Sequence, residues 1–482
     1  MRLARSSSED GREALLPSSR SSSPPSRWTS PIWKPHSLRS VAAQCLAFLR
    51  PSFLRRQPAA NGVSDSEKPV SPASKTAYLD GVRGVASLIV FCLHWSHVHY
   101  PSVNSGWGYE GRTSVWLLPF IRLVYSGAAM VAVFFVVSGF VLSHRFIQRM
   151  HRHEYPELLA SLSSITFRRA IRLFLPAFVS SLMAYICADL GVISIPSKVD
   201  GKSFEHGLSA YLDFLDMESN PWNWDANYLG FYNPQLWSIA VEFRGSMVVF
   251  LLVVGLARIR TAVRLAVEGF LVVHGFVHKR WDVALFIAGM MIAELEVLFP
   301  RKPQNTPKRR LANILLYTML VLGMFLAGYP RDGNHKTPLY MWSKNVWPYT
   351  AYRRRFWLAI GSILIVGPMA FLPSVQSVFL TRIARYLGRI SFALYLVHGL
   401  GNRTVGTWLT AACWGTIGYD TDLRYGISFT VATAIYFPLV VWVSDIFWRA
   451  VDVPSTNFAK WFEQQCMSPP PSPARDSPRL LA

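Results

Sequence analysis

Charged residues are scarce in this 482-residue chain, which has 16% Asp, Glu, Lys and Arg against 51% hydrophobic residues. Soluble globular domains carry about 25% charged residues, so the scarcity argues against a soluble enzyme. Acidic residues are rarer than basic ones, with 28 Asp and Glu against 49 Lys and Arg. The surplus cations lie at the ends of hydrophobic runs, a pattern that favours lipid headgroups over nucleic acid as partners.

Cysteine is also rare. The five cysteines are widely scattered and form no CxxC pattern, which excludes a disulfide framework and a structural zinc site. The start of the chain lacks a short hydrophobic stretch followed by a small-residue cleavage site. We therefore expect the first membrane helix to act as the targeting signal.

The first part of the chain is rich in Ser, Pro and Arg and poor in large hydrophobic residues. Residues 1–74 cannot bury enough apolar surface to offset the entropy lost on folding, so we predict a disordered, basic cytosolic tail. An organelle transit peptide is the weaker alternative, because Glu9, Asp10 and Glu13 lie where such peptides avoid acidic residues.

Long hydrophobic runs fill the rest of the chain. A helix needs about 20 mostly apolar residues to cross the hydrocarbon core of a membrane. We predict an all-α fold, a polytopic transmembrane helix bundle with about ten spans at 75–450 and a short cytosolic C-terminal tail at 451–482. The predicted spans lie near residues 80–99, 124–143, 173–193, 235–257, 262–278, 281–298, 311–328, 356–373, 386–408 and 426–447.

The loops between these spans alternate in charge. The basic loops, such as Arg145–Arg172 and Arg301–Arg310, face the cytosol by the positive-inside rule, which places both termini there. The cluster Arg353–Arg355 is an exception on the predicted outer side. Either this cluster has a local role or the span count fails at this point. The fifth and sixth spans are the least regular, because charged residues such as Glu268 and Asp282 interrupt them.

The first span carries two ionisable residues on one face. Arg83 and His94 are eleven positions apart, which returns a helix almost to the same face and separates the two by about 16 Å along the axis. A buried imidazole is suited to proton transfer, and burying an unpartnered polar group in a membrane costs free energy. We therefore favour a catalytic role for His94. Interfacial anchoring explains Arg83 equally well. His97 and His99 lack a carboxylate at a spacing that would complete a metal site with His94, and no metal is expected.

A second candidate is Glu242, at the start of the fourth span. If the span enters from the outer side, its carboxylate lies at a depth similar to that of His94 and can orient the imidazole. The alternative is a structural pairing with Arg244 or another buried group.

Two arginines precede the third span. Arg169 and Arg172 are three residues apart, so on a helix they share a face and can clamp a phosphate, with Arg83 on the same membrane side. Headgroup anchoring is the competing explanation. Ser138 and His398 are further candidates inside predicted spans. Small residues such as serine inside spans usually serve close helix packing. The sequence does not indicate a specific role for His398.

In order and spacing, these residues resemble the acyltransferase family 3 over about Ala77 to Trp448. The resemblance rests on Arg83 with His94, Phe-Phe-x-x-Ser-Gly-Phe at Phe134–Phe140, the Arg169/Arg172 pair followed by Pro176, Leu-Trp-Ser-x-x-x-Glu at Leu236–Glu242, and Ser-Phe-x-Leu-Tyr-Leu-Val-His at Ser391–His398. The N-terminal tail and the outer arginine cluster match no phrase of the family.

The resemblance implies transfer of an acyl group, often acetyl, from acyl-CoA to a hydroxyl of a small molecule, lipid or carbohydrate, including natural products. It implies that His94 is the catalytic base, that Arg83, Arg169 and Arg172 bind the donor, and that Glu242 is a supporting acid. Acyl-CoA is then a co-substrate and no bound cofactor is expected. The rival hypotheses are a secondary transporter that uses His94 and Glu242 as a proton or substrate pathway, and a non-catalytic scaffold whose basic tail binds anionic lipid.

Overall fold

The computed structural model describes residues 47–54, 76–195, 198–199, 202–203, 206–222, 231–300, 307–348 and 352–468. The chain divides into two units, Met1–Arg50 and Pro51–Ala482, and the account below concerns the second. The tail predicted at 1–74 lies mostly outside the described residues, and so does the end of the C-terminal tail.

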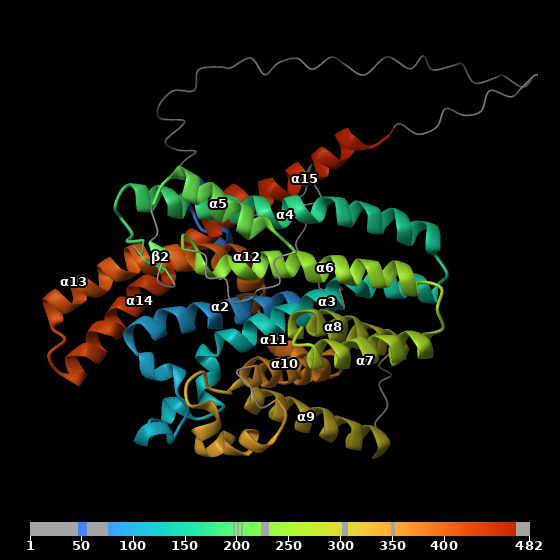
Figure 1. The fold of residues 1–482 in the computed structure, drawn as a ribbon, viewed down its shortest axis with the longest axis horizontal. Coiled ribbons are helices and arrows are strands. Elements are labelled where there is room, and N and C mark those ends of the chain that lie inside the picture. Colours follow the sequence, from blue (N-terminus) through green and yellow to red (C-terminus); the bar gives the residue numbers. More distant parts are fainter. Residues whose placement is uncertain are drawn as a thin grey trace, which may run out of the picture. The chain divides into compact units, whose positions relative to one another are not determined.

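The described part of the chain is almost entirely helical, as predicted (Figure 1). A two-residue antiparallel pair, β1 (Lys198–Val199) and β2 (Lys202–Ser203), accompanies the helices. The α-helices are α2 (Ala77–His99), α3 (Gly127–His151), α4 (Tyr155–Asp189), α5 (Leu208–Ser219), α6 (Trp237–Leu256), α7 (Thr261–Val277), α8 (Trp281–Leu298), α9 (Pro307–Ala327), α10 (Arg353–Phe371), α11 (Pro373–Phe379), α12 (Arg382–Gly401), α13 (Thr407–Ile417), α14 (Asp422–Phe447) and α15 (Val453–Cys466).

Short 3-10 and π-helical turns connect these helices. The 3-10 turns are η1 (Ser52–Leu54), η2 (Pro101–Asn104), η3 (Tyr109–Gly111), η4 (Val115–Leu117), η5 (Ile121–Tyr125), η6 (Pro234–Leu236), η7 (Asn334–Lys336) and η8 (Pro338–Asn345). The π turns η9 (Asn402–Gly406) and η10 (Trp448–Asp452) join α12 to α13 and α14 to α15. Because these two turns are helical throughout, α12 with α13 and α14 with α15 each form one uninterrupted helical segment.

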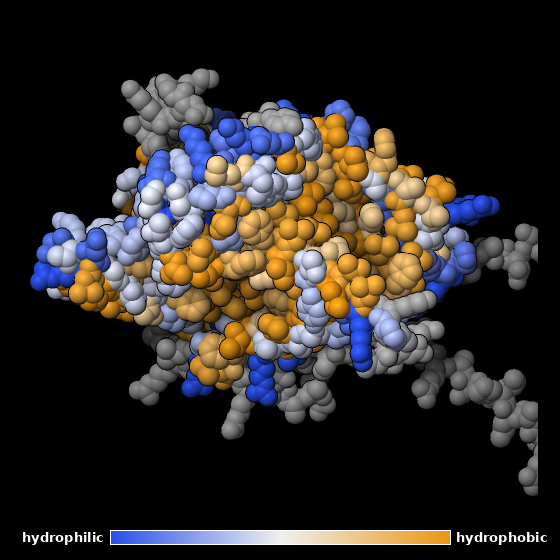
Figure 2. All heavy atoms as spheres, turned by 90° about the horizontal axis from the view of Figure 1, so that it is seen from below, coloured by the Kyte–Doolittle hydropathy of each residue, from blue (hydrophilic) through white to orange (hydrophobic). Residues whose placement is uncertain are grey.

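Seven helical segments in the described residues are long and apolar enough to cross a membrane. They are Ala77–His99, Gly127–His151, Tyr155–Asp189, Pro234–Leu256, Arg310–Ala327, Arg353–Phe371 and Asp422–Cys466. On α9, large apolar side chains such as Leu311, Ile314 and Leu322 are exposed. Hydrophobic side chains also cover a broad central zone of the face in Figure 2. Exposed apolar surface on this scale is typical of contact with lipid.

The other three predicted spans lie on α7, α8 and α12. Helix α7 has only 17 residues, and α8 contains Asp282, Glu294 and Glu296. The charges on α8 are paired inside the bundle, since Asp282 binds Arg244 at 2.5 Å and Glu294 binds Arg264 at 2.5 Å. These two helices are therefore held by buried ion pairs as well as by apolar packing.

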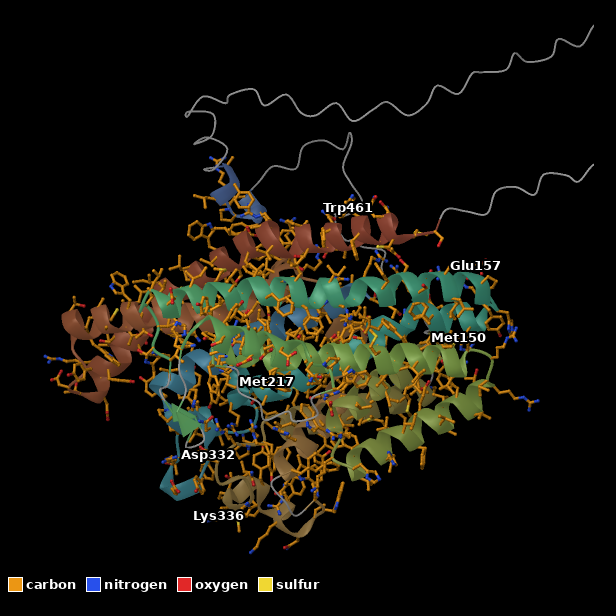
Figure 3. All side chains as sticks on the ribbon, turned by 45° about the horizontal axis from the view of Figure 1, so that its top comes forward. Met150, Glu157, Met217, Asp332, Lys336 and Trp461 are labelled. Atoms are coloured by element: carbon orange, nitrogen blue, oxygen red, sulfur yellow. The ribbon has the colours of Figure 1, made fainter. Side chains whose placement is uncertain are left out.

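The helices extend further than the hydrophobic runs. The third span was expected to begin at 173, but α4 is a single 35-residue helix that begins at Tyr155 and contains Pro176. Its N-terminal half is polar, so hydropathy alone does not detect it. Figure 3 shows Met150 and Glu157, which flank the α3–α4 connection, at one end of the helices, and Asp332 and Lys336 at the opposite end.

Close helix packing explains the Ser-Gly phrase of α3. A Cβ placed on Gly139 would collide with the backbone carbonyl of Phe286 in α8, and one on Gly289 would collide with the carbonyl of Val136 in α3. The two glycines thus bring the backbones of α3 and α8 into direct contact, as small residues do in membrane helix pairs.

We expect Gly139→Ala to destabilise the protein by about 1–3 kcal/mol, because the backbone atoms it meets cannot rotate away. Gly367→Ala is the matched control, since a Cβ at this helical glycine would meet only the Ile292 side chain at 3.8 Å or more. Thermal unfolding of the purified proteins in detergent measures both effects. Equal unfolding midpoints for the two variants would contradict this account of the interface.

Helices α2 and α12 also meet at glycines. A Cβ on Gly84 would collide with the backbone of Gly388, and a Cβ on Gly388 would collide with the carbonyl of Asp80. The contact sets the register between the two helices, which run side by side from this point toward the candidate site.

Candidate active site

The register of α2 and α12 brings two histidines together. His94 lies ten residues after Gly84, and His398 lies ten residues after Gly388. Because the two helices are parallel, equal spacing from the glycine contact places the imidazoles at the same level. Their ring centroids are 5.2 Å apart and the ring planes are tilted by 38°. The predicted candidates His94 and His398 are therefore neighbours.

The two histidines differ in exposure and in hydrogen bonding. His398 is fully buried, and its Nδ1 lies 3.0 Å from the carbonyl oxygen of Leu394. A carbonyl only accepts, so Nδ1 carries the proton and Nε2 presents a lone pair. That Nε2 has no hydrogen-bond partner among the described residues. His94 is exposed, so a substrate can reach its imidazole directly.

A polar network from η6, α6 and α12 lies beside His398. Tyr395 donates to the carbonyl of Gln235 at 3.0 Å and lies 2.7 Å from the hydroxyl of Ser238. The Gln235 amide packs directly on Gly399, the residue after His398. Its Nε2 is buried and has no hydrogen-bond partner in the described part of the chain. The Gln235 donor and the His398 acceptor are each costly to leave buried and unpaired without a ligand.

The three predicted donor-binding arginines form one cluster. Arg83, Arg169 and Arg172 lie within electrostatic range of one another. Arg172 is exposed, and the Nε of Arg83 has no partner within the described residues. Arg389 of α12 is exposed at the same level, next to the Gly388 contact.

Acidic groups lie beside the arginine cluster as well. Asp80 of α2 and Asp452 of η10 are electrostatic neighbours of Arg172. Neither was singled out from the sequence. Because they come from opposite ends of the chain, only the tertiary structure brings them to the cluster.

Glu242 belongs to this cluster and not to the histidine pair. Arg169 donates to the Glu242 carboxylate at 2.6 Å and to the hydroxyl of Ser246 at 2.9 Å. The expected contact between Glu242 and His94 is therefore replaced by an ion pair with Arg169. The alternative partner considered from the sequence, Arg244, binds Asp282 instead. The carboxylate binds Arg169 in this structure, and no hydrogen bond among the described residues joins it to the His94 imidazole.

Ser138 lies on α3 and is partly buried. It follows Phe134 by four residues, so the two share a helix face. The Phe134 ring contacts Tyr395 at 6.1 Å. Ser138 thus lies on the face of α3 that is turned toward α12, and its place among the candidate site residues stays a prediction.

Each arginine of the outer cluster has a local environment. Arg353 donates its Nε to the carbonyl of Pro348 at 3.1 Å, and Arg355 lies over the ring of Trp281 at 5.9 Å. Arg354 lines a cavity. These contacts explain why arginines occur at this end of α10, where the positive-inside rule does not expect them.

The fold and the site together define a helical membrane protein with a histidine pair between two parallel helices and an arginine cluster about three helical turns away. A family model described as an acyltransferase domain, that of the acyltransferase 3 family, matches residues 76–449. The chain belongs to this family, which confirms the resemblance drawn from the sequence.

Two fungal relatives are similar to the chain over most of its length. The O-acetyltransferase PaAT-1 of Phomopsis amygdali is 26% identical over 471 residues, which cover 89% of this chain and 91% of the relative. The acyltransferase clz18 of Cochliobolus lunatus is 25% identical over 453 residues, which cover 80% of this chain and 96% of the relative. No solved structure matches the chain.

Proposed function

We propose that this protein is a membrane-embedded O-acyltransferase that transfers a short acyl group from acyl-CoA to a hydroxyl group. Acetyl is the proposed acyl group. The observation that carries the proposal is the accessible imidazole of His94 beside the buried His398, on the same helix as Arg83. A natural-product acceptor is part of the proposal. Membership in the acyltransferase 3 family and similarity to a fungal O-acetyltransferase support the transfer of an acyl group to a hydroxyl.

The arginine cluster is the proposed donor end of the site. The phosphates of CoA would bind Arg83 and Arg172, while Glu242 holds Arg169 in place. The pantetheine arm would then run along α2 toward His94, over a rise of about 16 Å. Planar guanidinium groups bind phosphate through paired hydrogen bonds, which orients as well as attracts the donor.

Proton transfer takes place at His94 in this mechanism. The imidazole removes the proton from the acceptor hydroxyl as its oxygen attacks the thioester carbonyl carbon. The carbon–sulfur bond then breaks, and the departing thiolate takes the proton from His94 as free CoA is released. His398 is a positioning residue, because its fixed tautomer presents the Nε2 lone pair in the direct neighbourhood of the His94 ring. Gln235 Nε2 is the proposed donor to the developing oxyanion.

The proposed topology has ten spans with both termini in the cytosol. All ten predicted hydrophobic segments lie on helices, including α7, α8 and α12. The α3–α4 connection and the Asp332 loop lie at opposite ends of the helices in Figure 3, as alternating loops require. This arrangement puts the arginine cluster on the side where acyl-CoA is available.

Incubation of the purified protein with labelled acetyl-CoA and an extract of the native cells tests the function. We expect a labelled product and stoichiometric release of CoA. Labelled substrate that accumulates in vesicles without release of CoA would favour the transporter hypothesis. Neither product nor CoA release, with the protein folded, would reject the proposal.

We expect Arg172→Gln to raise the KM for acetyl-CoA by about 10- to 100-fold, because a charged hydrogen bond to phosphate is lost. Acetyl-pantetheine lacks the nucleotide phosphates, so its KM should stay unchanged. Arg424→Gln is the control, since Arg424 is exposed and paired with Asp420 at 2.9 Å. An equal effect on both donors would show that Arg172 acts elsewhere than on the phosphates.

A further inference from the structure

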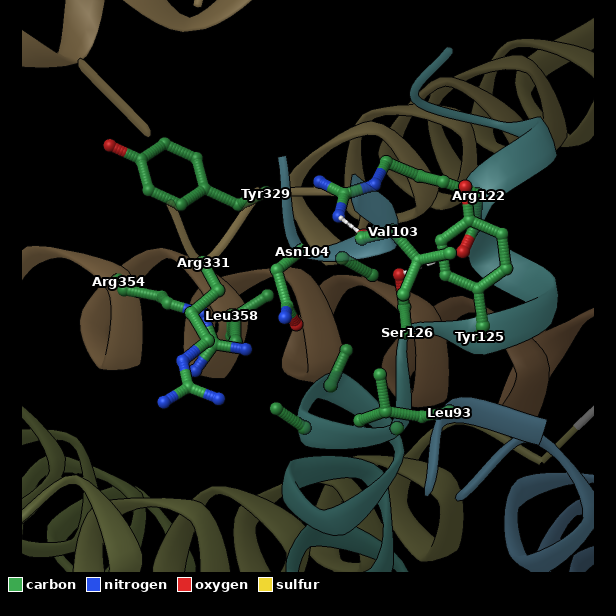
Figure 4. A pocket seen from close by; sticks show the side chains of 14 residues that line it. Leu93, Val103, Asn104, Arg122, Tyr125, Ser126, Tyr329, Arg331, Arg354 and Leu358 are labelled. Carbon is green, nitrogen blue, oxygen red and sulfur yellow. Dashed lines mark hydrogen bonds between the residues drawn. The ribbon is translucent and has the colours of Figure 1, made fainter. Parts of the chain in front are cut away.

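Three arginines line a cavity (Figure 4). The cavity lies next to the Asp332 loop, at the end of the helices opposite the α3–α4 connection (Figure 3). Arg122 comes from η5, Arg331 from the segment after α9, and Arg354 from the first turn of α10. Leu93 of α2 and Asn104 of η2 also contribute to the wall. Neither the family phrases nor the proposed mechanism uses these arginines.

The positive charge of the cavity exceeds the negative charge that the described residues place near it. Arg354 lies within electrostatic range of Arg122, Arg331 and Arg355, and the acidic group near it is Asp332. Asp332 is 52% exposed and lies 4.0 Å from Arg331. It does not line the cavity. One exposed carboxylate thus faces three guanidinium groups around a shared space.

Two of the arginines differ in how they are held. Arg122 is 4% exposed and donates to the carbonyls of Gly328 at 2.7 Å and Val103 at 2.9 Å. These two neutral carbonyls accept from its guanidinium without cancelling its charge, and its Nε has no partner in the described part of the chain. Arg354 has no hydrogen bond or ion pair within the described residues, and its Nε is buried. Arg331 is 59% exposed, but the like charges of the buried Arg122 and of Arg354, with its buried Nε, are costly unless an anion lies near them.

The backbone around the cavity adds to the same preference. Helix α3 begins at Gly127, and residues of its first turn line the cavity. Backbone N–H groups at the start of a helix favour an anion where they lack an acceptor. Ala129 donates its N–H to the carbonyl of Ser126 at 3.0 Å, so the N–H groups without a backbone acceptor in the described part of the chain are those of Gly127 and Ala128. Together with the unpaired guanidinium of Arg354, they form a site for a carboxylate or a phosphate.

Asn104 and Leu93 connect this cavity to the histidine pair. The Asn104 carbonyl accepts from the backbone N–H groups of Arg331 at 2.9 Å and Asp332 at 3.0 Å. Its side-chain amide lies 2.7 Å from Nδ1 of His97. His97 is three residues after His94, about one turn along α2, and Leu93 directly precedes His94.

We propose that the cavity binds an anionic group, a carboxylate or phosphate, of the acceptor whose hydroxyl is acylated at His94. The inference rests on the proposed function and adds the chemical class of the acceptor. The donor would then enter at the Arg172 end and the acceptor at the Arg354 end, with the imidazole between them. The anionic group would lie about one to two helical turns from the reacting hydroxyl.

The first experiment tests the cavity without an acceptor. Purified full-length protein in detergent is unfolded thermally with sodium benzoate or sodium phosphate, at an ionic strength held constant with chloride. We expect either anion to raise the midpoint by roughly 2–4 °C at saturation. Arg354→Gln should abolish the rise, Arg354→Lys should keep part of it, and Arg424→Gln should keep all of it. No rise in the wild type, or an equal rise in Arg354→Gln, overturns the anion site.

The second experiment tests whether the anion belongs to the acceptor. The protein is incubated with labelled acetyl-CoA and an extract of the native cells, and the labelled product is applied to an anion exchanger at pH 8. We expect the product to be retained, and Arg354→Gln to lower its formation by about 10- to 100-fold without changing the KM for acetyl-CoA. Label in the flow-through would overturn the acceptor assignment and leave a lipid headgroup or free phosphate as the bound anion.

These experiments separate the two proposals. If His94→Ala leaves labelled product formation unchanged, the proposed catalytic mechanism fails, whatever the anion does. If benzoate stabilises the wild type but no product forms from acetyl-CoA, the proposed function and the acceptor assignment fail together while the anion site stands.

Discussion

His94→Ala is expected to lower kcat/KM for acyl transfer by about 100- to 10,000-fold, the range over which a positioned general base contributes to catalysis. The side chain is exposed beside the buried His398, so its removal takes the proton acceptor from the substrate without opening the core. Labelled acetyl-CoA and an extract of the native cells provide the assay. The KM for acetyl-CoA should stay near that of the wild type, because Arg172 is about three turns away.

His99→Gln is the matched control for this prediction. His99 lies on the same helix, and its ring packs against Trp95 at 4.7 Å between centroids. It has no contact with His398 among the described ring pairs, so activity should be retained. The kcat/KM of His398→Ala should lie between those of His94→Ala and His99→Gln, because this change removes the neighbour of the base and leaves the base itself. Normal turnover of His94→Ala in a folded protein would reject His94 as the catalytic base.

Arg264→Met is expected to destabilise the protein by about 3–5 kcal/mol, because it leaves a buried carboxylate without its cation. Arg264 is 3% exposed and Glu294 is fully buried. Two hydrogen bonds join them, at 2.5 Å and 3.1 Å, and His151 adds a third contact to Glu294 at 2.8 Å. Glu268 lies nearby, fully buried, which raises the cost of removing the only arginine of the pair.

A double variant makes this prediction specific. Arg264→Met with Glu294→Leu removes both charges, and apolar replacement of a buried ion pair is often close to neutral. We therefore expect the double variant to recover most of the lost stability. The exposed pair of Arg424 and Asp420 gives the comparison, since Arg424→Met should cost about 1 kcal/mol or less. Thermal unfolding in detergent measures all three, and a double variant as unstable as Arg264→Met would contradict the ion-pair explanation.

Local sequence was sufficient for the long apolar helices and for part of the site. The predicted spans lie largely on helices, and seven helical segments in the described residues are long and apolar enough to cross a membrane, where a helix satisfies its own backbone hydrogen bonds. Arg169 and Arg172 share a face because their spacing is close to one helical turn. The start of α4 was missed, because its first turns are too polar for the hydropathy pattern to mark them as part of a span.

The pairing of Glu242 and the partner of His94 were not predictable in the same way. Depth in the membrane was the basis for placing Glu242 near His94, and depth says nothing about which helix lies beside α6. One signal was present, since Gly84 and His94 have the same spacing as Gly388 and His398. Equal spacing acquires meaning only once α2 and α12 are known to be parallel and in contact.

The sequence alone determined the helical membrane fold, the family and the chemical types of the site residues, because these depend on composition, periodicity and short ordered phrases. The tertiary structure decided which of those residues meet: His94 with His398, Glu242 with Arg169, and Arg354 with Arg122 and Arg331. Such pairs join segments far apart in the chain, and for His94 and His398 the geometry follows from the glycines that let the backbones of α2 and α12 touch.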